Sequence, residues 1–218
     1  MKNIMFIAPP AAGKGTQAEL VTEKYNLPHI STGDILRDIA KEDSEIGNYV
    51  AETMASGKLV KDEITYQLIE DRLAKEDCKN GFIIDGFPRN LEQAIEYDKI
   101  LAKLGYEVGN VILLDIEPKT LEKRITGRRV CEDCRTIFNI NDPAKAPQVD
   151  SVCDKCGGKL YQRQDDNLEA FQTRYAMYQE KTEPIIEHYR KQNVLHEVDA
   201  NNTFDIVSKQ VDEIISKN

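Results

Sequence analysis

The 218-residue sequence has no apolar run approaching the roughly 20 residues that a membrane-spanning helix requires. Its N-terminus, MKNIMFIAPP, is too short and is broken too early by proline to be a secretory signal peptide. It also lacks an excess of positive charge: the formal net charge is −9, whereas wholesale nucleic-acid binding needs a basic surface that displaces counterions. We therefore expect a cytoplasmic protein with neither a membrane nor a nucleic acid as its partner.

Two catalytic motifs are also missing. There is no G-x-S-x-G motif for a nucleophilic serine, and no N-K-x-D motif for reading a guanine base. The three histidines, His29, His188 and His196, fall in strand-like or amphipathic contexts, so we interpret them as structural. A serine hydrolase and a GTPase switch are thus disfavoured.

Short apolar segments alternate with helical patterns along most of the chain. Strands are predicted over residues 3–8, 27–31, 81–85, 110–116 and 193–200. Helices are predicted over residues 13–25, 62–76, 90–105, 120–129 and 203–217. This alternation is typical of an α/β fold in which a parallel sheet is covered by helices on both faces. Ligands of such folds bind beyond the carboxyl ends of the strands.

Two stretches interrupt this alternation. Residues 129–164 have little helical periodicity, several prolines and glycines, and four of the five cysteines, so we interpret them as a small inserted domain. Residues 31–60 read as short helices between strands and form a second candidate insert. No internal repeat or low-complexity segment is present.

The four clustered cysteines have the spacing of a metal site. Cys131 and Cys134 form one C-x2-C pair, Cys153 and Cys156 form another, and 18 residues separate the pairs. Each C-x2-C pair forms a tight turn, called a knuckle, and two knuckles complete a tetrahedron of thiolates around Zn²⁺. A metal with four cysteine ligands has no open coordination position, so we expect a structural site and not a catalytic one. Two disulfides, or iron in place of zinc, remain alternatives. Cys78 has no partner in the sequence, and we interpret it as structurally incidental.

The segment APPAAGKGTQ, residues 8–17, partly matches the phosphate-binding pattern G-x-x-x-x-G-K-[S/T]. Gly13 and Lys14 fit the pattern. Ala8 stands at the first glycine position, Gly15 stands where the hydroxyl residue belongs, and Thr16 comes one place late. A strand-to-helix turn with an exposed lysine is the alternative interpretation.

The neighbouring prolines explain part of this mismatch. A residue before proline is extended, so Ala8 does not need to be glycine, and we expect Ala11 to have a negative φ as well. Prolines donate no N–H, which leaves the amides of residues 11–16 as the phosphate-binding nest. We expect Gly13 and Gly15 to supply positive-φ freedom and close approach.

Charged residues downstream fit a nucleotide site. Asp85 ends an apolar strand, as expected of an acid that helps hold Mg²⁺, and Arg89 follows a sharp turn. The alternative for Asp85 is a solvated strand end. Arginine forks suit phosphate oxygens, and arginines gather at both edges of the cysteine insert, at Arg124, Arg128, Arg129, Arg163 and Arg174. The alternative for these arginines is surface pairing with Asp165, Asp166 or Glu122.

Taken together, the motifs GKGTQ, HISTGDILR, DGFPRN, TGRRVCEDC, CDKCGG and YQRQDDN closely resemble the adenylate kinase family in its long-lid, zinc-containing bacterial form. The resemblance covers the whole chain and keeps the family's motif order. It implies reversible phosphoryl transfer from MgATP to AMP, giving two ADP, by an enzyme with Mg²⁺ and a structural Zn²⁺, which we expect to be a monomer.

The resemblance also implies a division of the chain. The family's fold is a P-loop, three-layer α/β core with a parallel five-stranded sheet, here residues 1–30, 61–127 and 165–218. A segment that binds nucleoside monophosphate corresponds to residues 31–60, called the helical insert below. A small zinc-binding lid corresponds to residues 128–164, called the lid below.

Residue roles are implied in the same way. Residues implied to bind ATP are Ala11, Ala12, Gly13, Lys14, Gly15, Thr16, Arg128, Ile137 and Phe138. Residues implied to bind AMP are Thr32, Arg37, Lys58, Leu59, Val60, Gly86, Phe87, Pro88, Arg89, Gln93, Arg163 and Arg174. Residues implied in catalysis are Lys14, Arg89, Arg124, Arg128, Arg163 and Arg174, with Asp85 orienting water around Mg²⁺.

Two rival functions remain open at this point. Another nucleoside monophosphate kinase would share these motifs, because base choice depends on pocket contacts, although Thr32 and Gln93 favour adenine by resemblance. A non-catalytic zinc-ribbon module on a P-loop scaffold would act through partners. The net negative charge and the arginines beside the insert count against that module.

Overall fold

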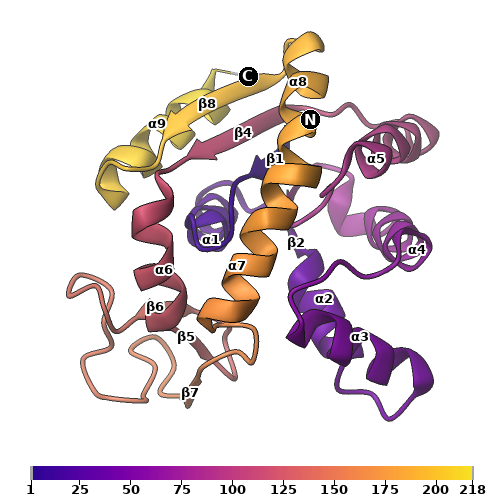
Figure 1. The fold of residues 1–218 in the computed structure, drawn as a ribbon. Helices are drawn as coiled ribbons and strands as arrows, with labels where there is room; N and C mark the ends of the chain where they lie inside the picture. The colour runs from indigo at the N-terminus through magenta and orange to yellow at the C-terminus, as the bar shows by residue number, and fades with distance from the viewer. Residues whose placement is uncertain (1, 218) are drawn as a thin grey trace.

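A computed structural model describes residues 2–217 and contains a parallel five-stranded sheet in the order β2-β3-β1-β4-β8 (Figure 1). Its strands are β1 (Lys2–Ile7), β2 (His29–Ser31), β3 (Gly81–Asp85), β4 (Asn110–Asp115) and β8 (Leu195–Asp199). All four neighbouring pairs are parallel. The predicted strands and the predicted α/β class are therefore confirmed.

Both faces of the sheet are buried, which explains why its strands read as continuous apolar runs. In β1, Ile4 and Phe6 belong to one core cluster, whereas Met5 and Ile7 belong to the cluster on the opposite face. Successive side chains of a strand point to opposite faces, so a run without polar residues is needed to fill both. The sheet is thus the middle of three layers.

Helices cover the two faces in separate groups. The cluster around Ile4 receives side chains from α1 (Lys14–Tyr25), α6 (Pro118–Gly127), α7 (Leu168–Met177) and α9 (Phe204–Ser216). The cluster around Met5 receives side chains from α4 (Asp62–Leu73), α5 (Leu91–Leu104) and α8 (Glu183–Lys191). Cys78, in the short 3₁₀ segment Glu76–Cys78, is fully buried in the second cluster, far along the chain from the four clustered cysteines.

Local signals set the ends of the predicted helices. In α5, the Asn90 side chain accepts a hydrogen bond from the Gln93 amide, and Gly105 ends the helix with a φ of 75°. The helix predicted over 120–129 ends earlier, at Gly127, and the next residues form a strand.

No helix was expected from the sequence at α7, at α8 or at the π-helical stretch Tyr178–Thr182 that joins them. In α7 only Ala170 and Phe171 are buried, so this helix carries no clear apolar stripe. In α8, Ile185 and Tyr189 are buried one turn apart, and this spacing was overlooked.

The two interruptions of the α/β pattern contain different kinds of elements. The helical insert contains α2 (Thr32–Ile39) and α3 (Glu45–Ala55). The lid contains a three-stranded antiparallel sheet of β5 (Arg128–Cys131), β6 (Ile137–Asn139) and β7 (Leu160–Tyr161), which its sequence did not predict. In Figure 1 both units lie at the lower end of the molecule, and α7 passes between them. Within residues 2–217, no helix is long and apolar enough to cross a membrane.

Candidate active site

A cavity of about 630 Å³ opens where the core, the helical insert and the lid meet. Its walls include the loop between β1 and α1, the end of β3, the start of α2 and the lid strand β6. This is the carboxyl edge of a parallel sheet, where ligands of open α/β folds bind.

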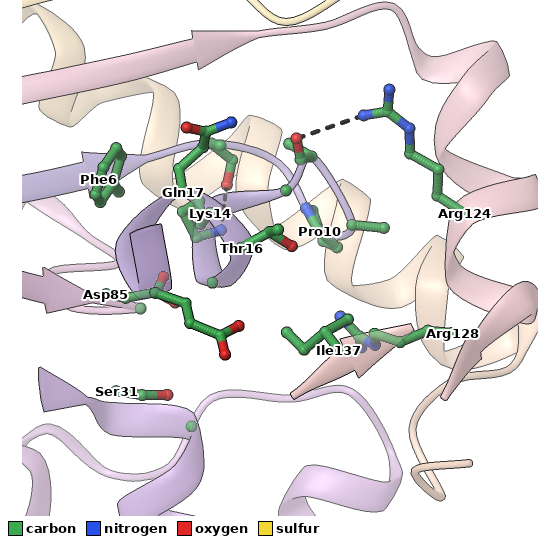
Figure 2. Close-up of a pocket in the computed structure, with 18 of the residues that line it drawn as sticks. Phe6, Pro10, Lys14, Thr16, Gln17, Ser31, Asp85, Arg124, Arg128 and Ile137 are labelled. Atoms are coloured by element: carbon green, nitrogen blue, oxygen red, sulfur yellow. Dashed lines mark hydrogen bonds between the residues drawn. The ribbon is translucent and has the colours of Figure 1, made fainter. Parts of the chain in front are cut away.

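The loop between β1 and α1 has the form of a phosphate nest. Gly13 caps the helix with a φ of 104°, and no atom would lie within 4 Å of a Cβ placed there. The backbone conformation, not lack of space, therefore requires glycine. Lys14 Nζ donates to the Ala8 carbonyl at 3.0 Å, so the lysine folds back along the loop (Figure 2).

Two expectations about this loop were wrong. Ala11 has a φ of 66°, not a negative value. The loop needs a left-handed residue at this point, and alanine adopts that conformation only at a cost of about 1–3 kcal/mol. Gly15 lies inside α1 and has no positive φ, yet a Cβ there would approach Ile137 Cδ1 to 3.2 Å. Gly15 therefore permits the lid to approach the loop. Ala8 is not among the described residues with positive φ, as expected.

Lys14 is buried in the cavity wall. Burial lowers the pKa of Lys14 to about 8, because desolvation penalises the ammonium, and Arg89, Arg174 and Arg128 lower it further. Asp85 acts in the opposite direction, but no carboxylate among residues 2–217 forms an ion pair with Lys14. A bound phosphate would supply the missing negative charge.

Asp85 ends β3 beside this lysine. Burial alone would raise its pKa, but the nearby His29 ring and the positive charges of Lys14 and Arg89 lower it to about 2. His29 Nε2 lies 3.8 Å from Asp85 Oδ2. The carboxylate is therefore ionised and lines the cavity, which suits it to a hydrated cation.

The turn after β3 positions Arg89. Its Nε donates to the Gly86 carbonyl at 2.6 Å, and its backbone amide donates to Gln93 Oε1 at 2.7 Å. Gly86 has a φ of 82°, and a Cβ there would lie 2.7 Å from Thr32 Oγ1 and 3.1 Å from the Arg89 guanidinium. Glycine is thus required both by conformation and by the close approach of α2.

Arginines from the edges of the lid converge on the same cavity. Arg128 forms a two-pronged ion pair with Asp166, and Arg174 Nη1 lies 2.7 Å from Asp165. The alternative of ion pairing is therefore correct for these two residues, but the pairs are mostly buried instead of lying on the surface, and their arginines line the cavity. Arg163 contacts Asp34 of α2 at 3.4 Å.

The buried arginines destabilise one another's charged forms, which lowers the pKa values of two of them. Burial, followed by the nearby charges of Arg37 and Arg128, lowers the pKa of Arg163 to about 10. Burial also lowers the pKa of Arg174 to about 10, and Arg128 and Arg89 add to the effect despite Asp165. Buried like charges of this kind favour an anionic ligand.

The lid supplies the opposite wall of the cavity. Ile137 and Arg128 face the phosphate loop across the cavity in Figure 2. Arg124, at the end of α6, reaches the Ala12 carbonyl through Nη1 at 3.4 Å. Phe138, beside Ile137, is almost fully buried in the small lid core.

Most of the residues expected in the site line this cavity. Those that do are Ala11, Ala12, Gly13, Lys14, Gly15, Thr16, Arg37, Leu59, Asp85, Gly86, Pro88, Arg89, Arg124, Arg128, Ile137, Phe138, Arg163 and Arg174. Those outside its lining are Thr32, Lys58, Val60, Phe87 and Gln93. Both ends of the Gln93 amide are engaged internally, with the Arg89 amide and with Asp62.

Several residues that line the cavity were not expected from the sequence, including Asp34, Arg135, Lys145 and Phe204. Asp34 lies within the motif HISTGDILR, which could have identified it. Arg135 and Lys145 belong to the lid, and Phe204 begins α9. No local motif marks these three residues, because folding of the lid and of α9 against the loop brings them there.

The four clustered thiols form a second centre, in the lid. Cys131 Sγ lies 3.5 Å from Cys156 Sγ, and Cys134 Sγ lies 3.6 Å from Cys153 Sγ. All four sulfur atoms lie within 4.8 Å of one another. A disulfide would require about 2.05 Å, whereas four thiolates around a metal at about 2.3 Å are separated by about 3.8 Å. The four thiols are therefore arranged to hold a metal ion.

A parallel sheet, a glycine-containing loop that leads into α1, and arginines gathered around that loop define a P-loop protein that handles phosphate groups. The sequence model of the family described as adenylate kinase matches residues 6–194. The chain belongs to the adenylate kinase family.

Curated relatives agree over nearly the full length. An adenylate kinase of Thermosipho africanus is 46% identical over 215 residues, which cover 99% of this chain and 100% of the relative. An adenylate kinase of Caldanaerobacter subterraneus is 45% identical over 95% of this chain and 93% of its own length. One from Archaeoglobus fulgidus is 43% identical over 99% of this chain and 98% of its own length.

Proposed function

We propose that the chain catalyses reversible phosphoryl transfer between MgATP and AMP, giving two ADP. The observation that carries this proposal is the cluster of buried cations that lines the cavity beside the phosphate loop, in which burial and neighbouring cations lower the pKa values of Lys14, Arg163 and Arg174. Such a site is stabilised by polyanionic ligands, and two nucleotides bring the required phosphates together.

ATP occupies the side of the cavity formed by the loop and the lid. The amides of residues 11–16 cradle its phosphates, and Lys14 turns from the Ala8 carbonyl to their outer oxygens. Ile137 and Phe138 cover its base, and Arg128 contacts the phosphate that transfers. The 3.2 Å approach of Ile137 to a Cβ at Gly15 supports a lid that closes directly onto this loop.

AMP occupies the side formed by the helical insert and the turn after β3. Arg37 and Arg89 bind its phosphate, Leu59 and Pro88 line its pocket, and Arg163 and Arg174 bridge the two substrates. The proposed AMP site also includes Thr32, Lys58, Val60, Phe87 and Gln93. Gln93 and Thr32 do not line the cavity but support residues that do. Gln93 accepts a hydrogen bond from the Arg89 amide, and Thr32 packs against Gly86.

The residues perform the reaction by alignment and charge neutralisation. The AMP phosphate is already an anionic nucleophile, so no strong general base is needed. The negative charge that spreads over the transferring phosphoryl group is neutralised by Arg124, Arg128, Arg163 and Arg174. The lid excludes water, which would otherwise accept the phosphoryl group.

Two metals complete the proposed enzyme. Asp85, which is ionised, would orient the water ligands of a Mg²⁺ ion bound with ATP, and this ion would supply positive charge to the phosphates. Zn²⁺ held by Cys131, Cys134, Cys153 and Cys156 stiffens the lid, as the thiol separations support. The enzyme acts as a cytoplasmic monomer without nucleic-acid partners, in keeping with its net charge of −9.

A coupled assay of ADP formation with ATP and each of AMP, GMP, CMP and UMP tests this function. We expect rapid ADP formation with AMP alone. Preference for another monophosphate would assign the chain a different substrate, and no turnover with any of the four would favour a non-catalytic binding module.

A further inference from the structure

Besides the contact of Arg163 with Asp34, a second ion pair joins the lid directly to the helical insert. Arg135 Nη2 lies 2.8 Å from Asp38 Oδ1, and the two residues are 97 positions apart in the chain. Arg135 lies between the lid strands β5 and β6, whereas Asp38 is in the last turn of α2. The Arg135 side chain also lines the cavity between them. The pair therefore links the two proposed nucleotide-binding units beside the cavity.

The backbone at Arg135 is unusual for a residue with a long side chain. Arg135 follows the metal-ligand position Cys134 and has a φ of 64°, and its amide donates to the Cys131 carbonyl at 3.2 Å. This left-handed conformation closes the tight turn of the thiol knuckle, and glycine would adopt it without strain. An arginine here keeps a guanidinium at a strained position, which points to a role for the side chain.

A second lid contact provides a comparison. Lys155, in the other knuckle, lies 2.6 Å from Glu23 and 3.3 Å from Glu19, both on α1 of the core. This contact joins the lid to the core and does not involve the helical insert. Among the described residues, two lid arginines thus pair with the helical insert, Arg163 with Asp34 and Arg135 with Asp38, and only Arg135 lies outside the proposed nucleotide ligands.

We propose that Arg135, through Asp38, is a positioning residue that couples nucleotide binding by the lid to AMP binding by the helical insert. The inference rests on the proposed function. The pair forms only when the lid and the helical insert both face the cavity. A nucleotide that moves one of these units toward the cavity therefore makes the pair easier to form, and this favours binding of the second nucleotide by the other unit. This coupling is reciprocal, because it is a free energy shared by the two sites.

The solvent exposure of the Arg135 and Asp38 side chains limits the strength of the coupling. The side chains of Arg135 and Asp38 are 36% and 57% exposed, and Asp38 also pairs with Lys41 at 3.1 Å. Ion pairs as exposed as this one are weak. We expect the Arg135 pair to account for about a two- to fivefold change in affinity for one nucleotide when the other is bound.

Titration calorimetry measures this factor directly. The Kd of AMP is determined alone and with saturating β,γ-imido ATP, and the Kd of the analogue is determined alone and with saturating AMP. Arg135→Ala and Asp38→Asn are expected to reduce the coupling factor by about two- to fivefold in both directions, with the affinity of each nucleotide alone unchanged. Lys155→Gln is the matched control, and it should leave the coupling factor unchanged.

Two further variants separate coupling from stability. Arg135→Gly relieves the left-handed strain, so its Tm should match or exceed that of Arg135→Ala while its coupling stays low. The charge exchange Arg135→Asp with Asp38→Arg should restore coupling that either single change removes. Bound zinc is measured in every variant, and Asp38→Asn, which is remote from the thiols, carries the test if a change at position 135 releases metal.

Three outcomes would overturn the inference. Unchanged coupling in Arg135→Ala and Asp38→Asn would show that the pair is incidental. An equal loss in Lys155→Gln would show a general effect of lid contacts. Weaker binding of one nucleotide alone, with coupling retained, would make Arg135 a direct ligand. A failure of the proposed function itself would be distinct, because the unmodified protein would then form no ADP.

Discussion

The core clusters on the two faces of the central sheet consist mainly of isoleucine, leucine, valine and aromatic side chains, whereas the lid cluster consists of Cys131, Phe138, Cys153 and Leu160. Apolar burial stabilises the core without help, since each fully buried aliphatic side chain contributes about 1.5–3 kcal/mol. Two of the four buried residues in this cluster are themselves thiols of the metal site. A unit with so small an apolar core depends on its metal.

The core and the lid also differ in how their charged side chains are paired. The core carries Lys14 and Asp85 in buried positions without an ion pair between them, and the surrounding apolar clusters compensate for the cost of desolvation. The lid mostly presents paired arginines, such as Arg128 with Asp166. A stable scaffold can hold unpaired charge ready for a ligand, while a small insert cannot.

The largest expected effect comes from removing the unpaired core cation. Lys14→Met should lower turnover by at least about 10²–10³-fold, because it deletes a preorganised positive charge at the phosphates. The fold should persist, since a buried desolvated ammonium is replaced by an apolar chain of similar length. Steady-state kinetics and melting curves check this, with Lys24→Met on the exposed side of α1 as the control. Normal turnover in a folded Lys14→Met protein would refute the phosphate-loop assignment.

Metal removal should separate the lid from the core. We expect one tightly held zinc per chain, and chelation should lower Tm and expose lid amides to hydrogen exchange before those of the central sheet. Hydrogen-exchange mass spectrometry with and without chelator measures the order. The comparison fails if both regions lose protection together. Protein isolated without zinc or iron, and without free thiols at the four positions, would instead indicate disulfides.

Arg89 allows the two nucleotide sites to be compared. Arg89→Ala should weaken AMP binding by about 10- to 100-fold, the effect of losing a charged hydrogen bond, and should affect ATP binding far less. Calorimetric titrations of both nucleotides decide the point. Equal losses would mean that the AMP pocket has been assigned to the wrong place.

The unpaired lysine also predicts a pH dependence. The folded-state pKa of Lys14 is about 8, below its ordinary value of 10.5, so between these values the unfolded chain binds more protons at this residue. The Lys14 contribution to the free energy of unfolding of nucleotide-free protein should therefore increase as pH rises from about 8 to 10.5. Denaturant titrations of the unmodified protein and Lys14→Met across this range measure the difference. Parallel curves would contradict the lowered pKa.

The smallest expected effects concern the two loop alanines. Ala11→Gly should stabilise the fold by about 1 kcal/mol, because Ala11 has a φ of 66°. Ala8→Gly should destabilise it by about 0.4–1 kcal/mol, because glycine adds freedom to the unfolded chain at a site without positive φ. Chemical denaturation of the two variants provides matched measurements. The same sign for both would show that backbone conformation is not the deciding factor.

Local signals predicted much of the fold. Apolar runs and helical periodicity gave all five strands of the central sheet and helices α1, α4, α5, α6 and α9, because both faces of the sheet are buried and these patterns are local. They missed α7, which buries only Ala170 and Phe171, the short helix α8, and the strands of the lid, which are only two to four residues long. Ala11 was predicted incorrectly because φ at this position is imposed by the whole loop.

By itself, the sequence determined the order of strands and helices along the chain, the spacing of the four thiols and the place of Lys14 at the start of a helix, since each depends on neighbours within a few residues. The tertiary structure decided the sheet order, the buried partners of Arg128 and Arg174, and the lowered pKa of Lys14. It also brought Arg135 to Asp38. Desolvation and contact between segments far apart in the chain exist only after folding, so no local pattern encodes them.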